Sequence, residues 1–171
     1  MSSKLSPEEI KKTEEQLGEL DKELELLRKK RIELNSKLAQ MEVSDYTMKD
    51  RNGNEKKLSE MFGDKSELIL IHNMGKSCSY CTMWADGFKD TYKEIEKKAA
   101  FVLVCPDKPE VHKEFAEAHG WNYPTYSANG TEFIYDMGYE IRKDYKVYYW
   151  PGVSVFEKND DGSIVRVSKD N

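Results

Sequence analysis

Two cysteines three residues apart, Cys78 and Cys81, are the side chains of this sequence best suited to chemistry. They follow the apolar run Leu68–Ile71 and a short loop, and Cys78 opens a segment with helical spacing. The first turn of a helix offers unpaired N–H groups and the positive end of the helix dipole, which both favour a thiolate. One helical turn also brings the second thiol close to the first. The spacing therefore predicts a dithiol that can form and break a disulfide.

The two thiols are expected to have different roles. The exposed N-terminal Cys78 would attack a substrate disulfide, and the more buried Cys81 would then attack the mixed disulfide and release the product. Ser79 and Tyr80 lie between the cysteines and are expected to tune the reduction potential. Lys76, just before the pair, would add positive charge near the thiolate.

A Cys-x-x-Cys pair can also bind zinc, which usually takes four protein ligands in a structural site. Cys105 and His72 each end an apolar strand, so a zinc site made of these two residues and the cysteine pair is one alternative. An inert, reduced pair is another. We favour redox exchange over both, and we expect no resident metal and no cofactor. For Cys105 itself, we favour a buried structural thiol over a third redox partner.

A long helix with its own apolar stripe precedes the dithiol. Ser6-Pro7-Glu8-Glu9 combines a capping box with proline at the first helical position, so the helix should begin here. Apolar residues then recur at alternating steps of three and four, as a coiled-coil seam requires. These residues are Ile10, Leu17, Leu20, Leu24, Leu27, Leu34, Leu38 and Met41. A lone helix cannot bury such a stripe. We expect it to pair with a second copy and form a homodimer; the alternative is packing against its own domain.

The rest of the chain is expected to form one α/β domain over residues 44–171, after a helical segment over residues 1–43. The patterns predict central strands at Leu68–Ile71 and Phe101–Val104, and a short extended segment at Tyr123–Ser127. Helices are predicted at Lys57–Phe62, Cys78–Lys98, Pro109–Gly120 and Glu132–Gly138. A small hairpin should turn at Asn52-Gly53, and a closing hairpin should consist of Gly152–Glu157 and Ser163–Val167. Strands that alternate with helices indicate a sheet with parallel central strands.

The helices of this domain also carry expected packing residues. Met83, Trp84 and Phe88 form an apolar face after the cysteines, and Trp84 and Phe88 are expected to lie in the core. His112 and His119 occur on the next helix and are expected to be surface or packing residues.

The composition argues against several classes of function. The 171 residues have a net charge of −5, so no basic surface for a nucleic acid is expected. No apolar run approaches the roughly 18 residues of a membrane helix, and the N-terminal segment lacks the apolar stretch of a secretory signal. We therefore expect a cytoplasmic protein with no membrane partner. Structural disulfides are rare in that compartment, which favours a redox or metal-binding role for two of the three cysteines.

The order of these segments resembles the thioredoxin-like superfamily, in its peroxiredoxin-like subset. More narrowly, it is similar to the bacterial family catalogued as domain of unknown function 899, described as predicted dithiol–disulfide oxidoreductases. The resemblance covers most of the chain and rests on Cys78–Phe88, Gly120–Pro124, Phe133–Gly138 and Pro151–Phe156. The segment Ile141–Tyr149 departs from the family. No Pro-x-x-x-Thr-x-x-Cys of the true peroxiredoxins precedes Cys78.

This resemblance implies a thioredoxin-like fold with central parallel strands and a C-terminal antiparallel hairpin, preceded by the long helix. In such a fold the loop that faces the dithiol carries a cis proline at the start of a strand, and Pro151 stands at that position. Trp150 before it is aromatic, which favours the cis form. Both residues are therefore expected at the edge where the substrate binds.

Together these arguments predict a thiol–disulfide oxidoreductase that acts through Cys78 and Cys81 on a protein or small-molecule disulfide. One alternative is a thiol peroxidase that uses Cys78 with Cys81 or Cys105. The other is a non-enzymatic dimeric interaction protein in which the cysteine pair senses redox state or holds zinc.

Overall fold

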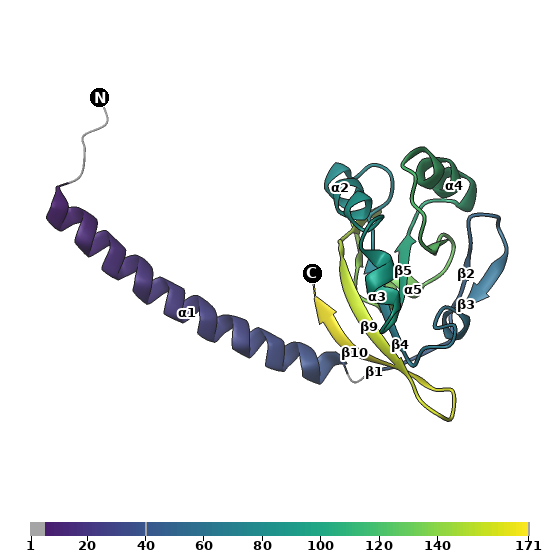
Figure 1. Cartoon of the computed structure of the whole chain (residues 1–171), viewed down its shortest axis with the longest axis horizontal. Coiled ribbons are helices and arrows are strands. Elements are labelled where there is room, and N and C mark those ends of the chain that lie inside the picture. The colour runs from purple at the N-terminus through teal and green to yellow at the C-terminus, as the bar shows by residue number, and fades with distance from the viewer. Residues whose placement is uncertain (1–5, 40, 171) are drawn as a thin grey trace. The chain divides into compact units, whose positions relative to one another are not determined.

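The computed structural model describes residues 6–39 and 41–170 of the chain. These residues belong to two compact units, which divide between residues 38 and 39. The first unit consists of a single helix, and the second contains a sheet flanked by short helices (Figure 1). Within the described residues, no helix is both long enough and apolar enough to cross a membrane.

Helix α1 (Pro7–Ala39) begins at the predicted capping box. The Ser6 N–H donates to Glu9 Oε2 at 2.8 Å, and the Glu9 N–H donates to Ser6 Oγ at 3.3 Å. At 1.5 Å per residue the helix is about 50 Å long. Met41, expected to end the apolar stripe, instead begins strand β1 (Met41–Val43), because its segment pairs in antiparallel register with the last strand of the sheet.

The second unit contains ten strands and five short helical segments within the described residues. The strands after β1 are β2 (Thr47–Lys49), β3 (Glu55–Lys57), β4 (Glu67–His72), β5 (Ala100–Cys105), β6 (Thr125–Ser127), β7 (Glu140–Lys143), β8 (Lys146–Tyr149), β9 (Gly152–Lys158) and β10 (Ile164–Asp170). The helical segments are η1 (Leu58–Glu60, a 3₁₀ turn), α2 (Ser79–Gly87), α3 (Tyr92–Glu96), α4 (Pro109–Ala118) and α5 (Phe133–Asp136).

Eight of the strands form one mixed sheet in the order β1-β10-β9-β4-β5-β6-β2-β3. Strands β4, β5 and β6 are parallel to one another, and β9 is antiparallel to β4. Strands β9 and β10 form the predicted C-terminal hairpin. The expected α/β architecture, with parallel strands at its centre and an antiparallel hairpin at its end, is confirmed.

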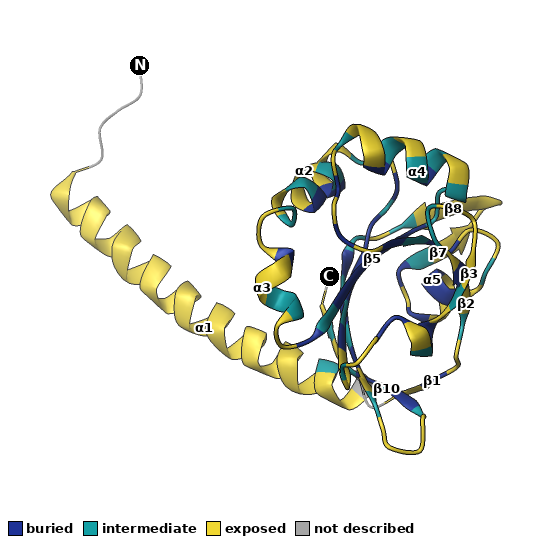
Figure 2. Cartoon of the chain, turned by 45° about the vertical axis from the view of Figure 1, so that its right-hand side comes forward, coloured by how far each residue is buried: buried dark blue, intermediate teal, exposed yellow. Residues whose placement is uncertain are grey.

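Side chains alternate across the central strands, so the sheet has an apolar core on each face. On one face Leu68 and Leu70 of β4 pack with α5, η1 and β9. On the other face Ile71 packs with residues of α2 and α4. Figure 2 shows the buried central strands with α2, α3 and α4 on one side and with α5, β7 and β8 on the other.

Two segments differ from their predictions. The helix expected over Cys78–Lys98 is interrupted after Gly87, giving α2 and α3 with a turn between them. Glycine costs a helix about 1 kcal/mol relative to alanine. Phe88, which follows Gly87, is the C-cap residue of α2, and its backbone N–H donates to the carbonyls of Ala85 and Asp86. The segment Ile141–Tyr149, for which no element was predicted, contributes to a separate two-stranded hairpin of β7 and β8.

Candidate active site

Cys78 is the N-cap residue of α2, as its predicted position at the start of a helix requires. Its Sγ accepts the backbone N–H of Cys81 at 3.1 Å. The Cys78 carbonyl meanwhile accepts the N–H of Thr82 at 3.0 Å, which closes the first turn. The Cys78 side chain is half-buried and lies at the end of the helix where the first backbone N–H groups have no partner within the helix.

The second thiol is in a different environment. Cys81 is buried, with 3% of its surface exposed. Burial, followed by the interaction with Cys78, raises the pKa of the Cys81 thiol to about 11. The pair therefore combines one accessible sulfur at the helix end with one protonated sulfur beneath it.

Hydrogen bonds from neighbouring loops fix the segment before Cys78. Asn73 Nδ2 donates to the Cys81 carbonyl at 3.3 Å, and Asn73 Oδ1 accepts the Gly75 N–H at 2.8 Å. Asp107 Oδ2 accepts the Lys76 N–H at 2.6 Å. Gly75 has a φ of +91°, and a Cβ there would lie 2.7 Å from the Asp107 carboxylate, so only glycine fits without displacement.

Helix α2 is also held farther along its length. The Tyr123 hydroxyl donates to the Ala85 carbonyl at 2.8 Å. Asp86 accepts the Trp121 indole N–H at 2.8 Å and lies 3.2 Å from His119 Nδ1. These three contacts tie the helix to the segment that follows α4, so the dithiol rests on a fixed support.

Sequence reasoning missed these positioning residues. Asn73 and Asp107 both follow the ends of parallel strands, where polar side chains of α/β proteins gather, and this placement could have identified them. Asp86 carried no comparable signal. Besides the nearby Lys89, its partners His119 and Trp121 follow it by 33 and 35 positions along the chain.

The outward face of α2 differs from its prediction. Tyr80 is 80% exposed and Met83 is 68% exposed. Trp84 is 38% exposed, so the expectation that it lies in the core is wrong. The helix instead buries Cys81 and Ala85, which are four residues apart and therefore lie on the same face of this short helix, toward the sheet. Phe88 packs on the core as expected, and Ser79 is exposed.

Cys105 and His72 do not join the cysteine pair in one metal site. Cys105 lies in the core beneath α2, whereas the ring of His72 stacks on Tyr139 on the other face of the sheet, with 3.7 Å between ring centroids. Burial raises the pKa of the Cys105 thiol, which supports a packing role. Among residues 6–39 and 41–170, no group of three or more His, Cys, Asp or Glu side chains is arranged to hold a metal ion.

Pro151 lies where β9 begins, and the next residue, Gly152, pairs with His72 at the end of β4. The register therefore brings Pro151 to the sheet edge from which the dithiol loop departs. The expectation of a cis bond is wrong, because the Trp150–Pro151 bond is trans. The Trp150 N–H donates to the Tyr139 carbonyl at 2.8 Å, so the chain is already extended when it reaches the proline and a trans bond leads it into β9. The Trp150 side chain is half-exposed.

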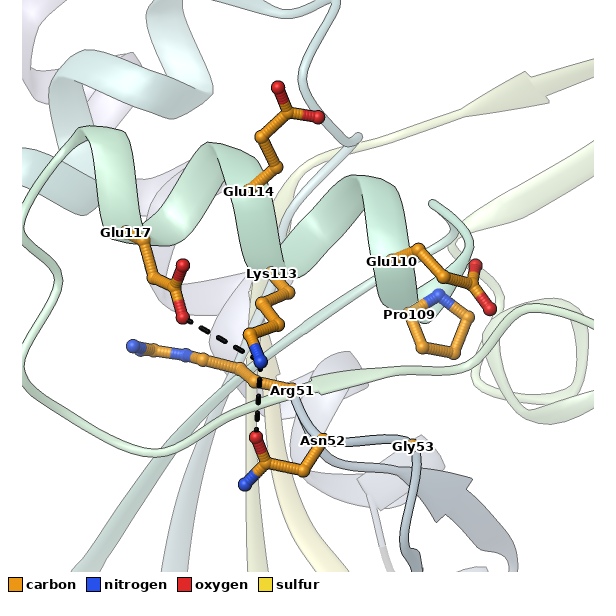
Figure 3. Close-up of a pocket in the computed structure, with 8 residues that line it drawn as sticks. All are labelled: Arg51, Asn52, Gly53, Pro109, Glu110, Lys113, Glu114 and Glu117. Atoms are coloured by element: carbon orange, nitrogen blue, oxygen red, sulfur yellow. Dashed lines mark hydrogen bonds and ion pairs between the residues drawn. The ribbon is translucent and has the colours of Figure 1, made fainter.

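A groove of about 450 Å³ lies elsewhere, between the β2–β3 turn and α4 (Figure 3). Its two cations are already engaged. Arg51 donates to the carbonyls of Trp121 and Tyr123, both at 2.7 Å, and Lys113 lies 4.0 Å from Glu117. The groove thus contributes to the packing of α4 and contains none of the dithiol residues.

Comparisons with known proteins agree with this architecture. Residues 4–169 match a family described as bacterial protein of unknown function (DUF899). No curated protein matches the chain. Peroxidoxin BcpB from Mycobacterium tuberculosis is similar in structure, with a TM-score of 0.61 and 24% identity over 76% of this chain and 84% of that one.

Two further solved structures are similar. A peroxiredoxin-like protein from Aquifex aeolicus has a TM-score of 0.59 and 14% identity, over 77% of this chain and 74% of that one. The thioredoxin domain of a thiol-disulfide oxidoreductase from Bacteroides vulgatus has a TM-score of 0.54 and 18% identity, over 78% of this chain and 88% of that one. At these identities the likeness shows the fold, and the predicted thioredoxin-like, peroxiredoxin-like fold is confirmed.

Proposed function

We propose that this chain, which belongs to the DUF899 family of bacterial proteins of unknown function, is a thiol–disulfide oxidoreductase that acts through Cys78 and Cys81. The observation that carries the proposal is the asymmetry of the pair. Cys78 caps α2 with its sulfur, while Cys81 is buried one turn below it. Exchange needs both parts, an accessible attacking thiolate and a second thiol held close to the first mixed disulfide.

The reaction would proceed in two displacements. The Cys78 thiolate attacks one sulfur of a substrate disulfide, the substrate S–S bond breaks, and one substrate thiolate leaves. Cys81 then attacks Cys78 Sγ, the mixed disulfide breaks, and the second substrate thiolate leaves. The substrate gains two electrons and leaves as two thiols, and the protein loses these two electrons and is left with a Cys78–Cys81 disulfide.

The second displacement requires that Cys81 lose its proton. With a pKa of about 11, the Cys81 thiol is protonated at neutral pH. The high pKa keeps the buried sulfur unreactive until a mixed disulfide forms. The substrate thiolate that leaves in the second displacement can then take the Cys81 proton. A reducing compartment would return the protein to its dithiol form, so we propose the cytoplasm as its location.

Redox titration of the chain against glutathione tests the proposal directly. We expect a Cys78–Cys81 disulfide to form and to be reduced again in a single two-electron transition, with a Cys105→Ser variant behaving in the same way. A Cys81→Ser variant should accumulate the mixed disulfide on Cys78. The proposal fails if no Cys78–Cys81 disulfide forms under any oxidant. Stoichiometric zinc in the reduced chain, released on oxidation, would favour the zinc-holding interaction protein instead.

A thiol peroxidase is the second candidate, and the likeness of the fold to peroxidoxin BcpB and to a peroxiredoxin-like protein favours it. Here the Cys78 thiolate would attack a hydroperoxide oxygen, the O–O bond would break, and an alcohol would leave. Cys81 would then condense with the resulting sulfenic acid and release water. Rapid consumption of hydroperoxide that is abolished in Cys78→Ser, with slow reduction of disulfides, would select this function.

We further propose that α1 pairs with α1 of a second copy. On the helix itself Leu20, Leu24 and Leu27 follow one another at steps of four and three, and each is about half-exposed. That spacing matches a coiled-coil seam. Sedimentation should give a dimer for the whole chain and a monomer for a Leu20→Glu/Leu24→Glu variant. A monomer for the natural sequence would exclude this pairing.

A further inference from the structure

The β7–β8 hairpin has two different faces. Its register pairs Glu140 with Tyr149, Ile141 with Tyr148, Arg142 with Val147, and Lys143 with Lys146. Directly paired residues of an antiparallel ribbon share a face, and the faces alternate along the strands. One face therefore carries the pairs of Glu140 and Arg142, and the other carries the pairs of Ile141 and Lys143.

The first of these faces contacts the domain through Arg142 and Tyr149, although its Val147 is 50% exposed. Arg142 is bound to Glu132 at 2.7 Å and to Glu140 at 2.6 Å, and its guanidinium lies over the ring of Tyr135. Tyr149 packs against the core on the α5 face of the sheet. These contacts fix the hairpin to the domain by one side only.

The second face, which we call the outer face, consists of Ile141, Lys143, Lys146, Tyr148 and Trp150. Trp150, two positions beyond Tyr148, is counted with it because its side chain is exposed, although Tyr139, whose carbonyl accepts the Trp150 N–H, is buried. Ile141, Tyr148 and Trp150 are 46%, 50% and 51% exposed. Side chains of this size in one row on a small hairpin form a solvent-exposed apolar surface of the kind that marks interaction sites.

The hairpin also contains residues that oppose its own stability. Lys143 and Lys146 lie directly opposite each other, and neither has an ion-pair partner in the part of the chain that the structure describes. Like charges in this position destabilise a ribbon. The turn between them, Asp144-Tyr145, has φ values of 51° and 59° without a glycine. Local choices against stability concentrate at functional sites.

The outer face begins beside the dithiol loop. From Trp150 the chain passes through Pro151 to Gly152, which pairs with the last residue of β4, and the dithiol loop starts there. Pro106 and Tyr149 line one hollow of about 290 Å³. The residue after Pro106, Asp107, accepts the Lys76 N–H of that loop. The base of the hairpin and the dithiol loop are therefore neighbours.

We infer that the outer face binds a polypeptide substrate, in an extended segment that presents apolar side chains and carboxylates next to its disulfide. This inference rests on the proposed function and names its substrate class. The apolar row suits alternate side chains of an extended chain. The two lysines suit carboxylates, since they are the charged side chains of the outer face and form no ion pair with any described residue, in a protein whose net charge is −5.

Binding can be tested without redox chemistry. The probe is a fluorescein-labelled, cysteine-free peptide of alternating leucine and serine that ends in two aspartates, with a second peptide that ends in two lysines. Fluorescence anisotropy gives the Kd of each for the whole chain. We expect the aspartate peptide to bind at least five times more tightly, and Tyr148→Ser to weaken its binding about tenfold.

Charge reversal supplies the decisive comparison. In Lys143→Glu/Lys146→Glu the preference should invert, so that the lysine peptide binds more tightly, an outcome that misfolding cannot produce. The matched control is Lys93→Glu/Lys98→Glu, which makes the same charge change at exposed positions on and after α3 and should leave both Kd values within twofold.

Three results would overturn the inference: no binding of either peptide, equal binding by all variants, or a hairpin variant that dissociates a dimer. The last would assign the outer face to a second copy of the chain. Because the peptides contain no cysteine, a chain that exchanges disulfides with glutathione but binds no peptide refutes only this inference. A chain that binds peptide but forms no Cys78–Cys81 disulfide refutes only the proposed function.

Discussion

The dithiol segment and the β7–β8 hairpin lie at the same edge of the sheet but are built in opposite ways. Asn73 and Asp107 hold the loop before Cys78, and Tyr123 and Asp86 hold α2 behind it. The hairpin is held by one face, while its other face exposes apolar side chains and two opposed lysines that form no ion pair within the described part of the chain. A reacting sulfur needs a fixed position, because exchange requires aligned sulfur atoms. A recognition surface needs exposed groups whose partner is another molecule.

The largest expected effect concerns the chemistry of the dithiol side. Cys78→Ser should lower the rate of disulfide reduction about 100-fold or more, since a hydroxyl cannot replace the thiolate nucleophile. Binding of the cysteine-free aspartate peptide should be unchanged. Parallel assays of exchange and anisotropy measure this. If Cys78→Ser also abolished peptide binding, the dithiol segment and the outer face of the hairpin would not have separate roles.

The next largest effect is a fall in the free energy of unfolding of the domain at acid pH. His112 on α4 lies 2.7 Å from Thr125 Oγ1, and burial lowers the pKa of its imidazole to about 4. An unfolded histidine takes up its proton near pH 6.5, whereas the folded one remains neutral until about pH 4. Between these values the unfolded state binds more protons, so the free energy of unfolding should fall by up to about 3 kcal/mol as the pH drops.

Urea unfolding at pH 7, 5.5 and 4.5 checks this window, with His112→Gln as the comparison. Burial also lowers the pKa of His72, so some acid sensitivity should remain in the variant. The variant should nevertheless lose less stability between pH 7 and pH 4.5 than the natural sequence. An identical loss in both proteins would show that His112 does not contribute.

The glycine beneath the dithiol loop gives a smaller effect. Gly75→Ala places a Cβ against Asp107 at a φ of +91°, so we expect a loss of about 2 kcal/mol in unfolding free energy and slower exchange. Gly63→Ala is the matched control, because Gly63 also has a positive φ but a Cβ there meets nothing within 4 Å. The control should cost about 1 kcal/mol and leave exchange unchanged. Equal effects at both positions would argue against a special role for the Gly75–Asp107 contact.

The sequence predicted the parts of this edge that depend on local patterns. Apolar runs such as Leu68–Ile71 identified the central strands, and the spacing of Cys78 and Cys81 after one of them identified the helix start. The capping box at Ser6 located the first turn of α1. In each case the signal lies within a few residues of the structure that it specifies.

Features that depend on distant partners could not be predicted. Whether Trp84 is buried depends on how much of α2 the sheet beneath it covers, and the pattern of one helix does not contain this information. The trans bond at Pro151 lies at the base of a hairpin that had no strand prediction, next to the hydrogen bond from the Trp150 N–H to the Tyr139 carbonyl. That hairpin was missed because its turn, Asp144-Tyr145, lacks the glycine by which such turns are recognised.

The smallest effect tests the hairpin itself. Tyr145 is fully exposed with a φ of 59°, so Tyr145→Gly should remove the backbone strain and stabilise the hairpin by somewhat less than about 1 kcal/mol. Slower hydrogen exchange of the amides of Ile141 and Tyr148, a hydrogen-bonded pair of the ladder, would measure this, since local opening governs their exchange. Exchange of disulfides with glutathione should not change, because Cys78 is positioned by other contacts. Faster amide exchange in the variant would mean that the Tyr145 side chain itself stabilises the turn. The hairpin would then be fixed by side-chain contacts, as the dithiol segment is.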